Sequence, residues 1–322
     1  MDLKKIIIPI KAELDIFQEQ FSGSLKSNVA LIDLITRYIL RQKGKKIRPA
    51  LVLLSAKLCG KVNDRTYIAA NLVELLHTAT LIHDDVVDEA KTRRGLASIN
   101  AVWKNKVSVL MGDYLLSKGL LLSLDNNEFQ FLKITSEAVR RMSEGELLQI
   151  QKARNFDATE ETYFKVISDK TASLFSACCK IGGLSVTDDE SIIAKLGSYG
   201  ENLGIAFQIQ DDVLDYAGRK KLLGKSTGND LKEKKFTLPL IKALSNAPKK
   251  RSVEMMKLIK SDSLKKFKDV YDFVYEYGGI DYAIERMEEY SAKAKASIKD
   301  FKNSEVKTSM TDLLNYLEIR NN

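Results

Sequence analysis

The stretch DRTYIAANLVELLHTATLIHDDVVDEAKTRR, residues 64–94, begins as an apolar helix and ends in a run of charges. Its apolar side chains recur every three or four residues, at Ile68, Leu72, Leu75, Leu76, Ala79 and Ile82. This spacing predicts a helix that packs against its neighbours, with Asp64 as its N-cap. Three carboxylates follow, at Asp84, Asp85 and Asp88. Since burying a carboxylate without a partner is costly, we expect these side chains to face either solvent or opposite charge.

Helical spacing of apolar residues continues along most of the chain. Besides the first helix, we predict helices at 11–22, 28–42, 47–60, 101–124, 128–151, 159–181, 190–215, 237–245, 251–261, 265–278, 281–301 and 305–319. The 322 residues include four prolines, with none between Pro49 and Pro239, and proline interrupts helices. Two polar gaps, 89–98 and 217–237, show no composition shift that would mark a domain boundary. The sequence therefore predicts one all-α domain over residues 1–322.

The aspartate cluster has a second copy. HDDVVDEA at 83–90 is repeated in type as QDDVLDYA at 210–217, and each copy ends an apolar helix and precedes a basic loop. Helix positions four apart share one face about 6 Å apart, so Asp84 and Asp88 point the same way. The second copy forms a polar stripe of Gln208, Asp211, Asp212 and Asp215. Like charges at this spacing repel one another unless a cation intervenes.

The donor atoms of these clusters favour Mg²⁺, for which Mn²⁺ can substitute. Mg²⁺ prefers oxygen ligands and commonly binds carboxylates together with substrate phosphates. His77 and His83 are the only histidines, which disfavours a histidine-based zinc or iron site. The alternative is that both clusters are solvated helix ends. Two matching copies, each followed by Lys and Arg, argue instead for a site that holds a diphosphate.

Composition narrows the partners and the compartment. The formal charge of +8 favours anionic partners, and no nucleic-acid-binding motif is present, so phosphorylated small molecules rank above nucleic acid. Three cysteines, two of them adjacent, resemble neither a disulfide framework nor a zinc site and favour a reducing cytoplasm. The N-terminal apolar run is too short for a signal peptide. No segment is expected to reach the length of a membrane span, so we expect a soluble protein.

At these motifs the chain resembles the trans-isoprenyl diphosphate synthases, also called polyprenyl synthetases. The motifs appear in the family's order: GKKIRP at 44–49, ELLHTATLIHDDVVDEAKTRRG at 74–95, VLMGDYLL at 109–116, DKTASLF at 169–175, FQIQDDVLD at 207–215 and GKSTGNDLKEKKFTLPLI at 224–241. One DDxxD alone is a weak signal, whereas two with the intervening KT and the GK-rich loop are specific. The resemblance implies a bundle of antiparallel helices around a deep central cavity, usually as a homodimer.

The resemblance also implies a reaction, the head-to-tail 1'-4 condensation of isopentenyl diphosphate onto an allylic diphosphate. It implies Mg²⁺ ligands at Asp84, Asp88 and Asp211, with further ligands or supporting carboxylates at Asp85, Asp212 and Asp215. The allylic diphosphate would be held by Arg93, Lys170, Lys225 and Lys235. Isopentenyl diphosphate would be held by Lys45, Arg48, His77 and Arg94, while Thr171 and Gln208 would lie beside the allylic carbon. Asp169 and Lys234 stand where glycine is common in the family.

Two rival functions stay open. A type I terpene cyclase also ionises an allylic diphosphate with a DDxxD motif. Such cyclases usually carry a second motif containing Asn, Ser and Glu, whereas QDDVLD at 210–215 is rich in aspartate. A non-catalytic partner subunit of a heteromeric prenyl synthase typically lacks both aspartate motifs, and both are intact here.

The product length depends on the residues that precede Asp84 in its helix. A growing tail would run toward the N-terminus of this helix, past Thr80, Ala79 and Leu76. Short-chain members of the family commonly have an aromatic residue four or five positions before the motif, whereas Thr80 and Ala79 are small. Ala79 could alternatively serve close helix packing. Because HTATLIHDDVVDE resembles the long-chain branch of octaprenyl and heptaprenyl synthases, we predict an all-trans product of hexaprenyl to octaprenyl size. The alternative is a farnesyl or geranylgeranyl synthase.

Overall fold

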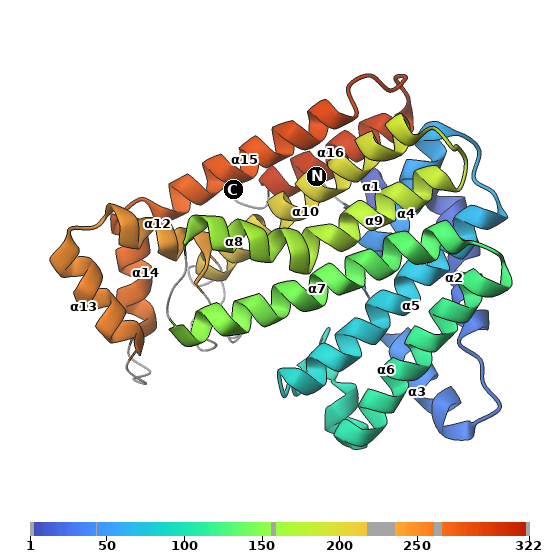
Figure 1. Cartoon of the computed structure of the whole chain (residues 1–322), viewed down its shortest axis with the longest axis horizontal. Coiled ribbons are helices and arrows are strands. Elements are labelled where there is room, and N and C mark those ends of the chain that lie inside the picture. Colours follow the sequence, from blue (N-terminus) through green and yellow to red (C-terminus); the bar gives the residue numbers. More distant parts are fainter. Residues whose placement is uncertain (1–2, 43, 156–158, 218–235, 261–265, 320–322) are drawn as a thin grey trace.

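The computed structural model describes residues 3–42, 44–155, 159–217, 236–260 and 266–319, and these residues are almost wholly helical (Figure 1). The N-terminal half contains α1 (Leu3–Ile6), the 3-10 helix η1 (Ile8–Ile10), α2 (Lys11–Ser24), α3 (Ala30–Arg41), α4 (Ile47–Cys59), α5 (Asp64–Val87), α6 (Ile99–Asp125) and α7 (Phe129–Asn155). The C-terminal half contains α8 (Glu160–Ile167), the π turn η2 (Ser168–Ala172), α9 (Ser173–Leu184), α10 (Glu190–Ala217), α12 (Leu238–Asn246), α13 (Lys249–Lys260), α14 (Lys266–Glu276), α15 (Gly279–Ser297) and α16 (Glu305–Ile319). The all-α prediction is confirmed.

The helices pack as neighbours along the chain and across it. α5 packs on α6, while α9 packs on both α4 and α10. α1 and α16, from opposite ends of the sequence, lie side by side (Figure 1). α13 and α14 lie at the end of the molecule away from α2, α3 and α6. The two long motif-bearing helices, α5 and α10, both pack on α9, and α10 also packs on η2.

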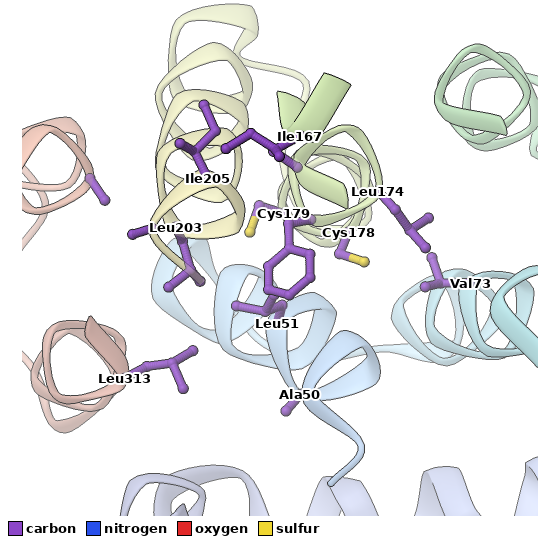
Figure 2. Close-up of a cluster of buried hydrophobic side chains, with 14 of the residues drawn as sticks. Ala50, Leu51, Val73, Ile167, Leu174, Cys178, Cys179, Leu203, Ile205 and Leu313 are labelled. Atoms are coloured by element: carbon purple, nitrogen blue, oxygen red, sulfur yellow. The ribbon is translucent and has the colours of Figure 1, made fainter. Parts of the chain in front are cut away.

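The core is one connected cluster of buried apolar side chains, which extends from Ile6 to Leu314. Its centre lies where α4, α9 and α10 meet, and Figure 2 shows Leu51, Cys178 and Leu203 there. Burial of this apolar surface is the main favourable term that holds the helices together. Cys178 and Cys179 are therefore core residues, and all three cysteines are free thiols.

Two local features differ from the sequence predictions. Asn63, not Asp64, is the N-cap of α5: its side-chain oxygen accepts the Thr66 backbone N–H at 3.2 Å, and the Thr66 hydroxyl accepts the Asn63 backbone N–H at 3.3 Å. Asp64 occupies the first helical turn, where a negative charge interacts favourably with the helix dipole. The predicted helix over 159–181 is present but is not α-helical throughout, because the π turn η2 lies between α8 and α9.

The polar gap after α5 contains a small hairpin. Strand β1 (Thr92–Arg93) pairs antiparallel with β2 (Leu96–Ala97), in the register Thr92↔Ala97. Arg94 and Gly95 form the turn with φ of 52° and 79°, the left-handed pair that tight hairpins require. The hairpin returns Arg93 and Arg94 toward the end of α5, next to the first aspartate motif.

Helix α6 is long and apolar enough, by length and composition, to cross a membrane, so the expectation that no segment reaches span length is wrong for this helix. One third of its most apolar 18-residue window is buried. Asp113 and Lys118 interrupt the apolar residues of the helix. Its exposed large side chains include Leu110, Leu121 and Leu124. A helix that packs in a core or an interface can have this same composition.

Candidate active site

The first aspartate motif lies at the C-terminal end of α5, where its three carboxylates separate into two groups. Asp84 and Asp88 are exposed, and the Asp88 backbone N–H bonds the Asp84 carbonyl at 2.8 Å. Asp85 is 3% exposed, and Arg93 Nε donates to its Oδ1 at 2.8 Å. Of the two roles open to Asp85, ligand or supporting carboxylate, this ion pair favours the second.

Asp84 faces a crowded set of charges. Loss of hydration is the main cause that raises the pKa of Asp84, and the nearby carboxylates Glu146 and Asp88 raise it further. Lys170 and Arg93 act in the opposite direction. A divalent cation placed beside Asp84 would favour its ionised form and relieve the repulsion. The electrostatics of this helix end thus suit a metal ion.

The second aspartate motif, near the end of α10, is divided in the same way. Asp212 is 5% exposed; Tyr163 Oη donates to its Oδ2 at 2.7 Å, and Gln208 Nε2 donates to its Oδ1 at 2.9 Å. Thr171 Oγ1 in turn donates to Gln208 Oε1 at 2.9 Å. Asp211 is exposed and Asp215 is half-buried. The structure therefore brings Thr171 and Gln208 into direct contact and occupies both oxygens of Asp212 with protein donors.

The π turn η2 connects the two motifs through space. Its Lys170 ion-pairs with Glu146 of α7 and donates to Gln149 Oε1 at 3.1 Å. The same ammonium lies close enough to Asp84 to oppose the rise in that carboxyl's pKa. The next residue, Thr171, contacts Gln208 of the second motif. Two consecutive residues of one turn thus act on different motifs, Lys170 through its charge on Asp84 and Thr171 through its hydrogen bond to Gln208.

Two glycines on neighbouring helices let η2 sit this closely. A Cβ atom on Gly145 of α7 would lie 3.0 Å from the Lys170 backbone nitrogen. A Cβ atom on Gly204 of α10 would lie 2.6 Å from the Ala172 Cα. Both distances are shorter than ordinary carbon contacts, so larger side chains at these positions would displace the turn.

A second polar region lies beside α5, on the side of the hairpin. A cavity of about 170 Å³ is lined there by Lys46, Glu74, Arg93 and Arg94, with apolar side chains from α2, α3 and α5 on its other walls. The Arg94 guanidinium packs so closely on Gly44 that a Cβ atom on residue 44 would lie 2.5 Å from Nη1. Arg93, which the resemblance assigns to the allylic diphosphate, lies in this cavity together with Arg94.

The buried polar contacts behind this cavity centre on His77. Arg48 Nη1 lies 3.0 Å from His77 Nε2, and an arginine can only donate, so Nε2 accepts and the ring proton is on Nδ1. Burial, followed by the charges of Arg48, Arg94 and Arg93, lowers the pKa of His77 well below its usual value. His77 is therefore neutral at physiological pH. Lys45 Nζ lies farther out, 5.8 Å from the ring centroid of Tyr316 in α16.

Sequence reasoning missed several residues of the site. Glu74 lies among Arg48, Arg94 and Lys46, which oppose the rise that burial causes in its pKa. Glu146, Gln149 and Tyr163 also contact predicted site residues. The one signal available for Glu74 was an acidic residue three positions before His77 in an apolar helix. Lys225 and Lys235 lie outside the described residues.

The predicted product-length residues lie on α5 before Asp84. Ala79 and Leu76 are buried, and Thr80 is half-buried with its hydroxyl donating to the His77 carbonyl at 2.9 Å. Leu76 packs against α6, where Leu76 Cδ2 lies 3.7 Å from the position of a Cβ on Gly119. At this level α5 therefore packs closely on α6.

Among the described residues, no group of three or more His, Cys, Asp or Glu side chains is close enough to hold a metal ion alone. Exposed carboxylates occur instead at Asp84 and Asp88, at the C-terminal end of α5, and at Asp211 on α10. Such a donor set suits a hard cation whose remaining ligands are waters and substrate phosphates.

Comparison with known proteins gives consistent matches over nearly the whole chain. The family model described as Polyprenyl synthetase matches residues 29–275. The all-trans-nonaprenyl-diphosphate synthase (geranyl-diphosphate specific) of Rhodobacter capsulatus is 33% identical over 315 residues, which cover 97% of each protein. The octaprenyl diphosphate synthase of Escherichia coli (strain K12) is 37% identical over 276 residues, 85% of each protein.

Solved structures of related synthases resemble this chain in both fold and sequence. A decaprenyl diphosphate synthase from Rhodobacter capsulatus has a TM-score of 0.94 and 32% identity, with 100% of both chains covered. Geranylgeranyl diphosphate synthases also match, both in sequence and in structure.

Proposed function

Because the chain belongs to the polyprenyl synthetase family, we propose that it joins isopentenyl diphosphate head-to-tail to an allylic diphosphate in a Mg²⁺-dependent reaction. The prediction of a prenyltransferase of the polyprenyl diphosphate synthase type, with its all-α fold, is confirmed by the relatives and the solved structures. The observation that best supports the proposed chemistry is the π turn, whose Thr171 bonds Gln208 of the second motif and whose Lys170 carries a positive charge that acts on Asp84 of the first.

Members of this family depend in general on divalent metal ions, and the donor set described above fits one. Asp84, Asp88 and Asp211 would hold Mg²⁺, while Asp85 and Asp212 orient their surroundings through Arg93 and Gln208. Asp215 is half-buried and would act as a further ligand or a supporting carboxylate. When bound, Mg²⁺ withdraws charge from a leaving diphosphate.

The protein's own residues prepare the ionisation. Lys170, beside Asp84, would donate to the allylic diphosphate as negative charge develops on it, and Arg93 would add a second cation from the hairpin. Lys225 and Lys235 would join them, as the family motif implies. The Thr171 hydroxyl donates its proton to Gln208, so its oxygen lone pairs are available to stabilise a nearby allylic carbocation without capturing it.

The second substrate would bind beside the hairpin. Arg48 and Arg94 lie close to neutral His77, and Lys45 would add a third cation as the family motif implies, which suits a diphosphate that is held but not cleaved. Positioning its double bond next to the carbocation converts a bimolecular encounter into a local reaction. The proton lost after bond formation would pass to the released diphosphate.

We propose that the product is all-trans and of hexaprenyl to octaprenyl length, for quinone side chains. The relatives include octaprenyl and heptaprenyl diphosphate synthases, which supports a long chain. The small residues Ala79 and Thr80 support it too, since neither position five nor position four before Asp84 holds a bulky side chain. The geranylgeranyl synthases among the matches keep the short-chain alternative open. A product of this length would then be handed to a membrane.

We further propose that the enzyme is a cytoplasmic homodimer whose interface includes α6. Large apolar side chains are exposed on and just after this helix, among them Leu110, Leu121, Leu124 and Phe129. A second copy of the chain would cover them, which would remove the exposed apolar patch from water. Sedimentation equilibrium tests this proposal directly. Free Cys59, Cys178 and Cys179 are compatible with a reducing compartment.

The deciding experiment incubates the purified chain, alone, with isopentenyl diphosphate and farnesyl diphosphate. We expect consumption of both substrates with Mg²⁺ and none after chelation. Consumption of the allylic substrate alone would indicate a terpene cyclase. An inactive chain that becomes active with a second protein would indicate a partner subunit.

A further inference from the structure

A cluster of ion pairs around the buried Asp169 lies behind the π turn, and of its members only Asp169 belongs to a motif named above. Asp169, in η2, is almost fully buried and both of its carboxylate oxygens are occupied. Arg141 Nε of α7 donates to Oδ1 at 2.8 Å, and Lys165 Nζ of α8 lies 2.8 Å from Oδ2. Burial opposes ionisation of Asp169, but the hydrogen bonds from Lys165 and Arg141 more than offset it, so the pKa of Asp169 lies below its usual value.

The same arginine extends the cluster to α10. Arg141 Nη2 donates to Glu201 Oε1 at 2.8 Å and to Ser168 Oγ at 3.0 Å. Ser168 Oγ in turn donates to Glu201 Oε1 at 2.7 Å. One guanidinium therefore joins three elements, α7, η2 and α10. We call Arg141, Ser168, Asp169 and Glu201 the brace.

The brace is directly attached to the residues that face the proposed reaction. Asp169 precedes Lys170 in the chain, yet the two side chains contact different partners: Asp169 binds Arg141, whereas Lys170 binds Glu146 and Gln149. π-helical turns are rare and occur mostly as single turns inside α-helices, so we attribute this one to the contacts that surround it. If η2 relaxed to an α-turn, the residues after it would rotate and Lys170 would leave Asp84.

We propose that Arg141, Asp169 and Glu201 are positioning residues, which hold the π turn so that Lys170 and Thr171 stay aligned with the two aspartate motifs. This inference rests on the proposed function only for its kinetic consequence. None of the three touches substrate in the arrangement described above. Their effect on the reaction passes through Lys170 and Thr171.

The test compares two adjacent arginines on α7. Arg141→Gln removes the centre of the brace, whereas Arg140→Gln removes an exposed arginine that pairs with Glu137 and Glu144 on the same helix. We expect Arg141→Gln to lower kcat by roughly 10- to 100-fold, since a misplacement of about 1 Å can cost about 100-fold, with the KM for isopentenyl diphosphate changed by less than about 2-fold. Arg140→Gln should match the wild type.

A double-mutant cycle separates positioning from general destabilisation. In a Lys170→Ala background, Arg141→Gln should cost much less than in the wild type, because the group that it positions is already absent. Equal losses in both backgrounds, or a wild-type kcat for Arg141→Gln, would overturn the proposal. Rescue toward wild-type kcat by Arg141→Lys, which keeps one charged donor, would support it.

Hydrogen exchange tests the brace independently of activity. Backbone amides of residues 168–172 should exchange at least about 10-fold faster in Arg141→Gln than in Arg140→Gln, while the amides of α15 stay unchanged. Unchanged exchange in the π turn would refute the brace even in an active enzyme. A wild-type chain that does not condense the two substrates would refute the proposed function and leave this measurement able to decide the brace.

Discussion

Replacing Tyr163 by Phe removes the hydroxyl group, and with it a hydrogen bond that joins α8 to the second aspartate motif. Tyr163 Oη donates to Asp212 Oδ2 at 2.7 Å, and both side chains are buried. A hydrogen bond to a charged group contributes about 1.5–3 kcal/mol, and its loss leaves a buried carboxylate oxygen with one donor fewer. We therefore expect the Tyr163→Phe variant to lose about 2 kcal/mol of the free energy of unfolding.

The chain offers a matched control for this change. Tyr199 is also buried, and its Oη donates at 2.8 Å to the Met310 backbone carbonyl, a neutral acceptor far from the aspartate motifs in the chain. Tyr199→Phe should cost about 1 kcal/mol, because neutral hydrogen bonds contribute about half as much. Urea denaturation measures both values.

The two variants should also differ in catalysis. Without the tyrosine hydroxyl, Asp212 keeps Gln208 as a donor, but its carboxylate can rotate. A rotation would shift Gln208 and, through the hydrogen bond between them, Thr171. We expect kcat to fall by roughly 10-fold for Tyr163→Phe and to stay unchanged for Tyr199→Phe. The reasoning is refuted if Tyr163→Phe is the less destabilising change and keeps full kcat.

Four further outcomes are expected. Asp84→Ala should cut turnover by roughly 100-fold or more while thermal stability in chelator stays equal or rises, since it removes a carboxylate from a repulsive setting; a loss of folding would contradict this. Arg94→Ala should mainly raise the KM for isopentenyl diphosphate, and Lys170→Ala should mainly lower kcat, so that identical kinetic signatures would disprove two separate pockets. Because the pKa of His77 is lowered in the folded state, the unfolded chain binds more protons below about pH 6.5, and acid therefore destabilises the fold. The His77→Gln variant has no titrating group at this position, so its urea midpoint should decline less between pH 7.5 and 5.5 than that of the wild type. An unchanged slope would count against a buried neutral His77. Ala79→Tyr should shorten the prenyl alcohols seen by mass spectrometry after dephosphorylation, whereas an unchanged distribution would mean that the tail takes another path.

Local sequence was sufficient for the helices and for the prediction of a site with oxygen ligands. The spacing of apolar residues before Asp84 indicates which face of α5 is buried, and this spacing can be read directly from the sequence. The repeated aspartates at 84–88 and 211–215 likewise carry their ligand chemistry with them. Helix ends were harder to predict from the sequence. Asn63 and Asp64 are both good capping residues, and Asn63 is the N-cap because it forms reciprocal hydrogen bonds with Thr66.

Other features were decided only by contacts between distant segments. Asp84 and Asp85 are chemically identical neighbours, yet Asp85 is buried against Arg93 because the hairpin turns that arginine back toward α5. The π turn within 168–172 has no local signature, since it exists where Gly145 and Gly204 allow close approach and Arg141 holds Asp169. Periodicity reports which face of a helix is buried, but not which side chain across the core will meet it, so the alignment of Lys170 and Thr171 followed from tertiary packing.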